Sequence, residues 1–153
     1  AYEITCGDWS SDVCSSDLFI AMIANSTDIS VCARLFELPR LNRQLVAKAQ
    51  QLGVSDEDSL RLQLIAEELF TNTVTHGFNG DSDTVVILDL TLSPAGIQLR
   101  YPDAAPPCDP TALPEQLASE ETPGGLGITL IRGMSRVFRY QRLNGHNVCE
   151  ITL

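Results

Sequence analysis

The chain has 153 residues, 44% of them hydrophobic and 20% charged, which is typical of one globular domain and excludes wholesale disorder. Its 20 Asp and Glu outnumber its 10 Lys and Arg, and the formal net charge of −10 argues against direct nucleic-acid binding. The longest apolar run, residues 18–24, is too short to cross a bilayer, so we expect no membrane association.

The 5 cysteines are odd in number and include no Cys-x-x-Cys pair. Such a set fits neither a disulfide framework nor a zinc site. The cysteines therefore indicate a reducing compartment, and we expect the protein to be cytoplasmic.

Residues 1–26 differ from the rest of the chain because they contain no Lys or Arg. Within them, the Ser- and Asp-rich stretch 7–18 resembles the conceptual translation of a common sequencing-library adapter. We therefore expect 1–26 to be a non-native or disordered leader, the alternative being a natural polar linker. We expect residues 27–153 to form one domain, which carries the function.

From residue 27 onward, the spacing of apolar residues predicts strands and helices in one compact domain. Gly53 marks the end of the first helix, Ser55 caps the second, and Asn144-Gly145 is a strong hairpin turn. In chain order, we expect a strand at 29–35, a helix beginning near Pro39, a helix at 56–76, strands at 84–92 and 97–101, an irregular segment at 102–123, a helix at 124–135, and strands at 137–142 and 147–153.

The helix expected at 56–76 has the most informative surface. Leu64 and Ile65 share one face with Glu68, Asn72 and His76, so an apolar stripe runs into a carboxylate, a carboxamide and an imidazole. Because buried polar groups without partners are costly, these side chains line a polar cavity, satisfy one another, or emerge into solvent at the helix end. For His76, a base role and a hydrogen bond to the adjoining loop both stay open.

Two further features lie later in the chain. Gly124-Gly125-Leu126-Gly127 opens the helix expected at 124–135, and glycine amides at a helix N-terminus suit an anion, although such a cluster is also common in tight turns. No Gly-Lys-Ser/Thr follows it and no strand leads into it, so it is neither a Walker A loop nor a Rossmann fingerprint. Asp103, at a strand end, is placed to accept a hydrogen bond from an exocyclic amine such as that of adenine.

These features occur together in the order and spacing of one known family. Residues 66–78, which include Glu68 and Asn72, resemble the N-box of GHKL-type ATPases. Residues 103–110 resemble the first glycine box of that family, 124–127 resemble the second, and 140–153 resemble its final hairpin. From residue 28 to residue 153, the chain resembles the anti-sigma-factor serine/threonine kinases of the RsbW type.

The resemblance implies a Bergerat fold, an α+β two-layer sandwich with a mixed, mostly antiparallel sheet, helices on one face and an ATP lid. It also implies that Glu68 is the general base, that Asn72 coordinates Mg²⁺, and that Asp103 reads the adenine amino group. The other nucleotide-binding residues that it implies are Ala105, Gly124, Gly125, Leu126, Gly127 and Ile128.

The function that the resemblance implies is that of an ATP-binding anti-sigma regulatory factor. Such a protein phosphorylates a serine or threonine on a STAS-type anti-sigma antagonist and sequesters a sigma factor, and it uses ATP and Mg²⁺. A homodimer is left open. A histidine-kinase ATP domain is disfavoured, because the chain has no room for a dimerisation helix pair.

Three departures from the family pattern favour an alternative, a non-catalytic partner-switching module with weak or structural ATP binding. Ala105 stands where the first glycine box usually has Gly, and Cys108 replaces its usual aromatic residue. Thr122 and Pro123 occupy the stretch in which the better-known kinases of the family carry an Arg. Arg132, in the following helix, is expected to face solvent, so kinase activity stays open.

Overall fold

The computed structural model describes residues 28–112 and 125–153, so the leader 1–26 and Gly124 lie outside the described residues. The helices are α2 (Leu38–Gln51), α3 (Asp56–Asn72) and α4 (Gly125–Met134). The strands are β1 (Ile29–Cys32), β2 (Val85–Ser93), β3 (Gly96–Asp103), β4 (Val137–Leu143) and β5 (His146–Thr152). The short helical segments are η1 (Leu35–Glu37), η2 (Thr73–Gly77) and η3 (Pro110–Ala112).

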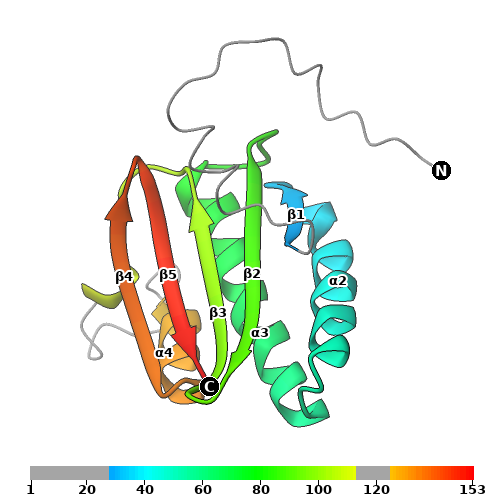
Figure 1. Cartoon of the computed structure of the whole chain (residues 1–153). Coiled ribbons are helices and arrows are strands. Elements are labelled where there is room, and N and C mark those ends of the chain that lie inside the picture. The colour runs from blue at the N-terminus through cyan, green and yellow to red at the C-terminus, as the bar shows by residue number, and fades with distance from the viewer. Residues whose placement is uncertain (1–27, 113–124) are drawn as a thin grey trace, which may run out of the picture.

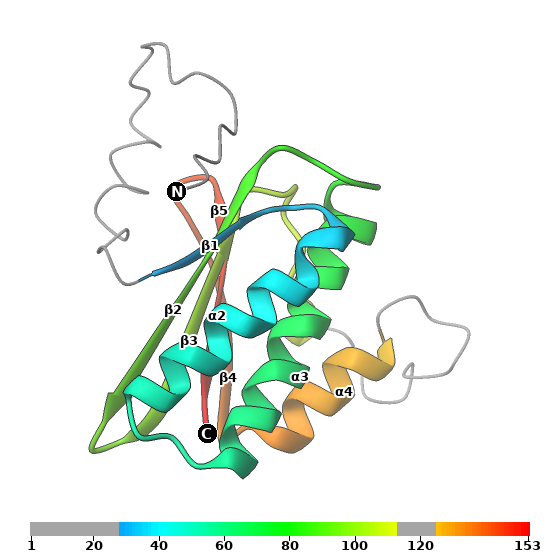
Figure 2. The same cartoon turned by 90° about the vertical axis from the view of Figure 1, so that its right-hand side faces the viewer.

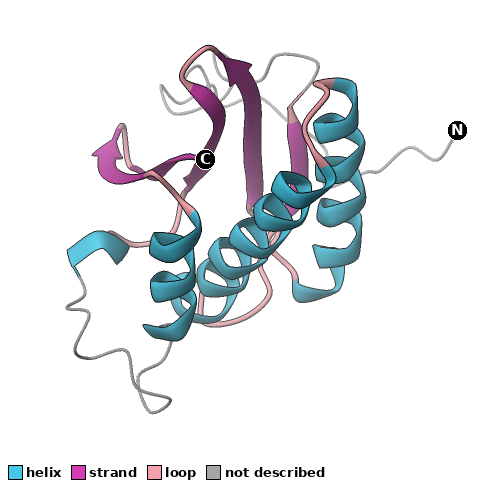
Figure 3. Ribbon diagram, turned by 90° about the horizontal axis from the view of Figure 1, so that it is seen from below, coloured by secondary structure: helices cyan, strands magenta, loops and turns pink. Residues whose placement is uncertain are grey.

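The strands form one sheet in the order β1-β2-β3-β5-β4, and each described pairing of neighbours is antiparallel. Helices α2, α3 and α4 cover one face of this sheet (Figure 1 and Figure 2). Seen from below, helices and strands occupy two separate layers (Figure 3). The predicted two-layer α+β sandwich is confirmed, with a sheet that is antiparallel rather than mixed over the described strands.

The hydrophobic core lies between the two layers. Every second residue of a strand points toward the helices, because successive side chains alternate between the two faces of a sheet. Phe70 of α3 and Tyr101 of β3 are among the largest fully buried side chains. Aliphatic residues from both layers surround them: Ile29, Val31, Leu41, Leu45, Leu62, Ile65, Val86, Leu88, Leu99, Ile131 and Ile151. Full burial of such a side chain contributes about 1.5–3 kcal/mol, so this core holds α3 firmly against the sheet.

Local sequence signals set the helix ends and the final hairpin as predicted. Gly53 has a φ of 73°, the left-handed conformation expected just after α2. The Ser55 hydroxyl accepts a hydrogen bond from the Asp58 backbone N–H at 3.1 Å and so caps α3. Asn144 (φ 48°) and Gly145 (φ 79°) form the tight turn between β4 and β5. These predictions are confirmed.

Two predicted strand ends are wrong, and contacts between distant segments explain both. The strand expected at 29–35 ends at Cys32, because the chain turns into η1, where the Leu35 N–H donates to Asp81 Oδ1 at 2.9 Å. The strand expected at 97–101 continues to Asp103, because β5 pairs with this end of β3. The described pairing of β2 with β3 stops at Arg100, so the missing N–H of the next proline costs no hydrogen bond to β2.

The long helix also differs from its prediction over the last turn. The α-helical part ends at Asn72, and residues Thr73–Gly77 continue as a π-helical turn. The Phe78 N–H donates to the Thr73 carbonyl oxygen at 2.9 Å, which closes this wider turn. Single π-helical turns are frequent at functional sites, since they change the direction of the side chains that follow.

The cap of α3 can be tested by removing the Ser55 hydroxyl. We expect Ser55→Ala to lower the free energy of unfolding by about 1 kcal/mol, because the Asp58 N–H loses its acceptor. Urea denaturation followed by circular dichroism measures this difference. Ser30→Ala, at an exposed strand position, is the matched control, and an equal effect of the two substitutions would contradict the assigned cap.

Candidate functional site

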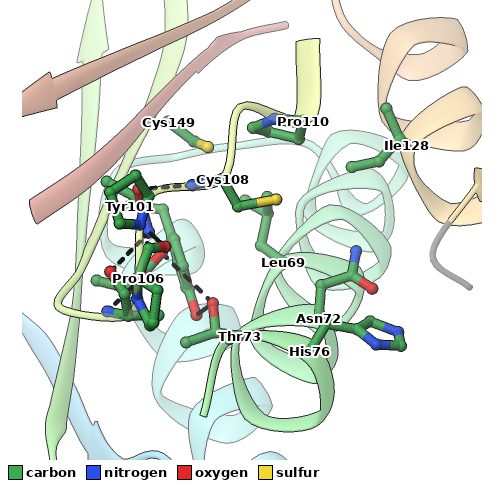
Figure 4. Close-up of a pocket in the computed structure, with 15 residues that line it drawn as sticks. Leu69, Asn72, Thr73, His76, Tyr101, Pro106, Cys108, Pro110, Ile128 and Cys149 are labelled. Atoms are coloured by element: carbon green, nitrogen blue, oxygen red, sulfur yellow. Dashed lines mark hydrogen bonds between the residues drawn. The ribbon is translucent and has the colours of Figure 1, made fainter. Parts of the chain in front are cut away.

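A cavity of about 240 Å³ lies where α3 and η2 meet the ends of β3 and β5 (Figure 4). Its walls are mainly apolar, with side chains from α3, β3, the loop after β3, β5 and α4: Leu69, Tyr101, Ala105, Pro106, Pro107, Cys108, Pro110, Ile128 and Cys149. Burial raises the pKa of the Cys149 thiol to about 12, so this wall stays uncharged. The polar side chains in the lining are those of Asn72, Thr73, His76, Asp103 and Asn147.

Asp103 is a buried carboxylate at the end of β3, with 7% of its surface exposed. Its Oδ1 accepts hydrogen bonds from the Ala105 N–H and from Asn147 Nδ2, each at 2.9 Å, and its Oδ2 accepts one from the Thr73 hydroxyl at 3.5 Å. Burial raises the pKa of Asp103, and the hydrogen bonds together with the charge of Arg142 oppose that rise. A carboxylate accepts about four hydrogen bonds, so Asp103 retains capacity to bind a further donor in the cavity.

The hydroxyl groups behind Asp103 form a chain of hydrogen bonds. The Tyr101 hydroxyl donates to Thr73 Oγ1 at 3.0 Å, and the Thr73 hydroxyl then donates to Asp103. Burial raises the pKa of Tyr101 well above its ordinary value, so its hydroxyl stays protonated and serves as the donor. Both hydroxyl groups therefore donate in the direction of the carboxylate. Thr73 reaches this position as the first residue of η2.

Asn147 connects Asp103 to the loop that follows β3. Its Nδ2 donates to Asp103 Oδ1 and to the carbonyl oxygens of Ala105 and Pro106 at 3.2 and 3.1 Å. Its Oδ1 accepts hydrogen bonds from the Cys108 N–H at 3.3 Å, from the Tyr140 hydroxyl at 2.9 Å and from the Arg142 guanidinium at 2.8 Å. One buried carboxamide thus fixes the loop over the cavity.

Asn147 was not predicted as a site residue, although the sequence carries a signal for it. In the register of the sheet, Asn147 is the partner of Asp103, and Cys149 is the partner of Tyr101. An asparagine at an inward-facing position of an otherwise apolar strand needs a polar partner when it is buried. Thr73 and Tyr101 were likewise not assigned, because their role depends on the π-helical turn.

Ala105, the residue that replaces a glycine of the family pattern, is 2% exposed and lies against η2. A methyl group added to Gly77 would place its Cβ 2.7 Å from the Ala105 Cβ. The absence of a side chain at Gly77 therefore provides the space that the Ala105 methyl group occupies. The two positions are complementary in size, and the loop keeps its close approach to the helix.

Asn72 and His76 lie together at the other end of the cavity. Figure 4 shows both side chains on the side of the cavity that faces α4. Of the alternatives for the polar stripe, the structure supports a polar cavity for Asn72, because its side chain is among those that line the pocket. His76 also lines the pocket but is exposed, at the mouth.

Glu68 lies outside the cavity lining, next to the first turn of α4. A methyl group added to Gly127 would overlap the Glu68 carboxylate, so the two residues are in close contact. Ile128 contributes to the cavity wall, whereas Leu126 is 55% exposed and is not among the residues that line the cavity. The structure thus brings Glu68 against Gly127 in the first turn of α4, and it brings Asn72 to the cavity that Ile128 of α4 also lines.

Arg132 does not face solvent as expected. Its guanidinium donates to the Thr111 carbonyl oxygen at 2.7 Å and so connects α4 with η3. Within residues 28–112 and 125–153, no three His, Cys, Asp or Glu side chains converge as a metal-binding group. Nor is any helix of those residues long and apolar enough to cross a membrane.

Comparisons with known proteins agree with this architecture. Residues 31–153 match the family model described as the histidine kinase-like ATPase domain. The chain is 31% identical over 111 residues to the serine/threonine-protein kinase BtrW of Bordetella bronchiseptica, in an alignment that covers 67% of this chain and 78% of BtrW. Its fold is similar to a chain of the SiaB-SiaC complex of Pseudomonas aeruginosa, with a TM-score of 0.52 at 11% identity, over 93% of this chain and 97% of that one.

The size complementarity of Gly77 and Ala105 can be tested with a double-mutant cycle. We expect Gly77→Ala to lower the free energy of unfolding by about 1–3 kcal/mol, because the added methyl overlaps that of Ala105. Adding Ala105→Gly is expected to recover much of this loss, with a coupling energy of about 0.5–3 kcal/mol from urea denaturation. Additive effects of the two substitutions would show that the methyl groups do not meet.

The raised pKa of Asp103 predicts how its carboxyl affects stability with pH. The folded protein binds this proton more tightly than the unfolded chain, whose Asp103 keeps the ordinary pKa near 3.8. The contribution of the group to the free energy of unfolding therefore falls as pH rises from that value through the folded-state pKa. We expect Asp103→Asn to gain in stability relative to the parent over this range, measured by urea denaturation. Asp56→Asn, at an exposed position, should show no such trend.

Proposed function

Because the chain belongs to the histidine kinase-like ATPase family of the GHKL superfamily, and within it to the anti-sigma-factor serine/threonine kinase type, we propose that it transfers phosphate from ATP to a protein. The acceptor in this proposal is a serine or threonine of a STAS-type anti-sigma antagonist, and the protein also sequesters a sigma factor. It would act in the cytoplasm. The GHKL domain itself is an ATP-binding, kinase-like domain.

The adenine end of ATP would be held at Asp103. The cavity beside this carboxylate is apolar, as an aromatic base requires, and the carboxylate retains room for one donor such as an exocyclic amine. Ala105 and Ile128 form parts of its walls. Because Asn147 and Thr73 already orient the Asp103 oxygens, little reorganisation is needed for this hydrogen bond.

The phosphate end would lie toward Asn72 and the start of α4. The Asn72 amide oxygen is a hard ligand that suits Mg²⁺, and the amides of the first turn at Gly125, Leu126 and Gly127 suit phosphate oxygens. When bound, Mg-ATP supplies the phosphoryl group, and the metal neutralises its oxygens. Gly124 is included in this proposal from the sequence motif alone.

Glu68 is the proposed general base. Its carboxylate lies one helical turn before Asn72 and against Gly127, so it borders the region assigned to the phosphates. There it would accept the proton of the acceptor hydroxyl, a contribution of about 10²–10⁴ in rate for a well-placed base. The observation that supports the whole proposal best is this one cavity, with Asp103 at one end and Asn72 beside α4 at the other.

The partner assignment is supported by the proteins that this chain is similar to. BtrW is named a serine/threonine-protein kinase, and SiaB was solved in complex with SiaC. A protein antagonist is therefore the proposed substrate, and a sigma factor is the proposed second partner.

One observation favours the alternative, a non-catalytic partner-switching module of the same fold. Arg132 donates to the Thr111 carbonyl oxygen, and the described lining of the cavity contains no Lys or Arg. A kinase without such a cation lacks one source of charge stabilisation for the transferring phosphoryl group. This alternative retains the ATP site and the partners but lacks the transfer step.

The metal and base assignments are tested by two substitutions on α3. We expect Asn72→Ala to abolish Mg²⁺-dependent binding in a titration with a fluorescent ATP analogue. Glu68→Gln keeps the shape of the side chain against Gly127, so it is expected to bind the analogue normally and to lose phosphoryl transfer to the antagonist by about 10²–10⁴-fold. Glu67→Gln, at the adjacent position, is the matched control and should affect neither measurement.

The results of these experiments test the metal assignment and distinguish a kinase from the non-catalytic module. Binding of Mg-ATP by Asn72→Ala as tight as that of the parent would contradict the metal assignment. A parent protein that binds the antagonist and ATP but transfers no phosphate would favour the non-catalytic module.

A further inference from the structure

Gly127 lies in the first turn of α4, where the conformation of the backbone does not require a glycine. The helix runs from Gly125 to Met134, and Gly127 is not among the glycines with a positive φ. A glycine inside a helix is less favourable than an alanine, because it loses more conformational freedom on folding. The reason for a glycine at this position is therefore to be found in its contacts.

The side chain that lies against Gly127 is that of Glu68 in α3. A Cβ added to Gly127 would overlap Glu68 Oε2, and it would lie 2.8 Å from Glu68 Cδ and 3.3 Å from Glu68 Cγ. The three nearest atoms that such a Cβ would meet outside its own stretch of helix thus all belong to Glu68. The partial positive charge at a helix N-terminus also favours a carboxylate at this place.

The packing of α4 decides which of the two groups would move if a methyl group were added. Ile128 and Ile131 are 4% and 0% exposed and belong to the hydrophobic core. Figure 2 shows α3 and α4 side by side on the same face of the sheet. A shift of α4 would open this core, whereas the Glu68 carboxylate is the end of a flexible side chain. A methyl group at position 127 therefore displaces the carboxylate and leaves the helices in place.

We propose that Gly127 is a positioning residue, which keeps the Glu68 carboxylate against the first turn of α4 by leaving space for it. This inference rests on the proposed function, in which Glu68 borders the phosphates. In the proposed transfer, Glu68 removes the proton of the acceptor hydroxyl while that oxygen bonds to the γ-phosphorus of ATP and the bond to ADP breaks. A displaced carboxylate no longer reaches this hydroxyl, although Asp103 and Asn72 still hold the nucleotide.

The same contact places a negative charge beside the region assigned to the phosphates. The described lining of the cavity contains no Lys or Arg that would offset it. Because like charges repel, Glu68 disfavours the binding of ATP without a metal, whereas Mg²⁺ neutralises the phosphate oxygens. This charge effect concerns binding alone, so it can be measured whether or not phosphate is transferred.

The first experiment compares the same substitution at two glycines of α4. We expect Gly127→Ala to lower kcat for transfer to the antagonist by about 10²-fold, with little change in the KM for ATP, because the base is misplaced and the nucleotide site is not. Gly133→Ala is the matched control, since Gly133 is exposed and an added Cβ meets nothing within 4 Å. It should change neither constant. Thermal unfolding followed by circular dichroism verifies that both variants are folded.

The second experiment separates misplacement of the base from a general structural defect. Glu68→Gln already lacks the base, so adding Gly127→Ala to it is expected to lower kcat no further. A structural defect caused by the methyl group would lower kcat again in this background. The result expected of a positioning residue is therefore complete non-additivity.

The third experiment titrates a fluorescent ATP analogue in the presence of a chelator and then with Mg²⁺. Without metal, we expect Glu68→Gln to bind about tenfold more tightly than the parent, because a like charge beside the phosphates is removed. Gly127→Ala moves this charge without removing it, so its affinity should lie between the two. With Mg²⁺, the three proteins are expected to bind alike. Glu67→Gln and Gly133→Ala are the matched controls and should resemble the parent in both titrations.

The outcomes distinguish a failure of this inference from a failure of the proposed function. Equal kcat values for Gly127→Ala and Gly133→Ala, with a parent that transfers phosphate, would overturn the positioning role alone. A raised KM with unchanged kcat would overturn it too, because the methyl group would then meet the nucleotide. A parent that binds ATP but transfers none would contradict the kinase and the base role. In that case equal binding by the parent and Glu68→Gln without metal would overturn the charge effect as well.

Discussion

The hydrogen bonds to the buried carboxylate of Asp103 are the constraint on which the rest of the site depends. A carboxylate with 7% exposure is costly unless it is well hydrogen-bonded. Its donors come from three separate segments: η2 through Thr73, the following loop through Ala105, and β5 through Asn147. Because Asn147 also bonds to Pro106 and Cys108, the need to satisfy one charge orders the loop above the cavity. The cavity is therefore organised by the fold itself.

Much of the fold was predictable because the signals for it are local. The left-handed Gly53, the Ser55 cap and the turn at Asn144 each depend on a few neighbouring residues. Asn72 and Asp103 were predicted from local signals as well. Asn72 follows from helical spacing, and Asp103 follows from its place at a strand end. The predicted boundaries failed where distant segments decide them, as at η1 and at the end of β3.

The unpredicted part of the site depends on register and on helix geometry. Asn147 becomes a partner of Asp103 only through the pairing of β3 with β5, which a sequence motif does not specify. Thr73 reaches the carboxylate only because the helix widens into a π-helical turn after Asn72. Ala105 departs from the glycine of the family pattern, yet its methyl group lies against Gly77, which has no side chain. A departure from a family motif is thus best judged together with the residue that it contacts.

The two faces of the sheet differ in chemistry. They can differ because successive residues of a strand point to opposite faces. On the helix face, Tyr101 and Cys149 are paired and belong to the cavity wall. On the other face, the adjacent residues Arg100 and Glu150 form an ion pair, with Arg100 Nε 3.7 Å from Glu150 Oε1. Side chains one position apart point to opposite sides of a sheet, so charge reversals on the open face leave the Asp103 hydrogen bonds intact. Substitutions on the open face and substitutions in the cavity therefore change separate sets of contacts, although the same strands carry both sets of side chains.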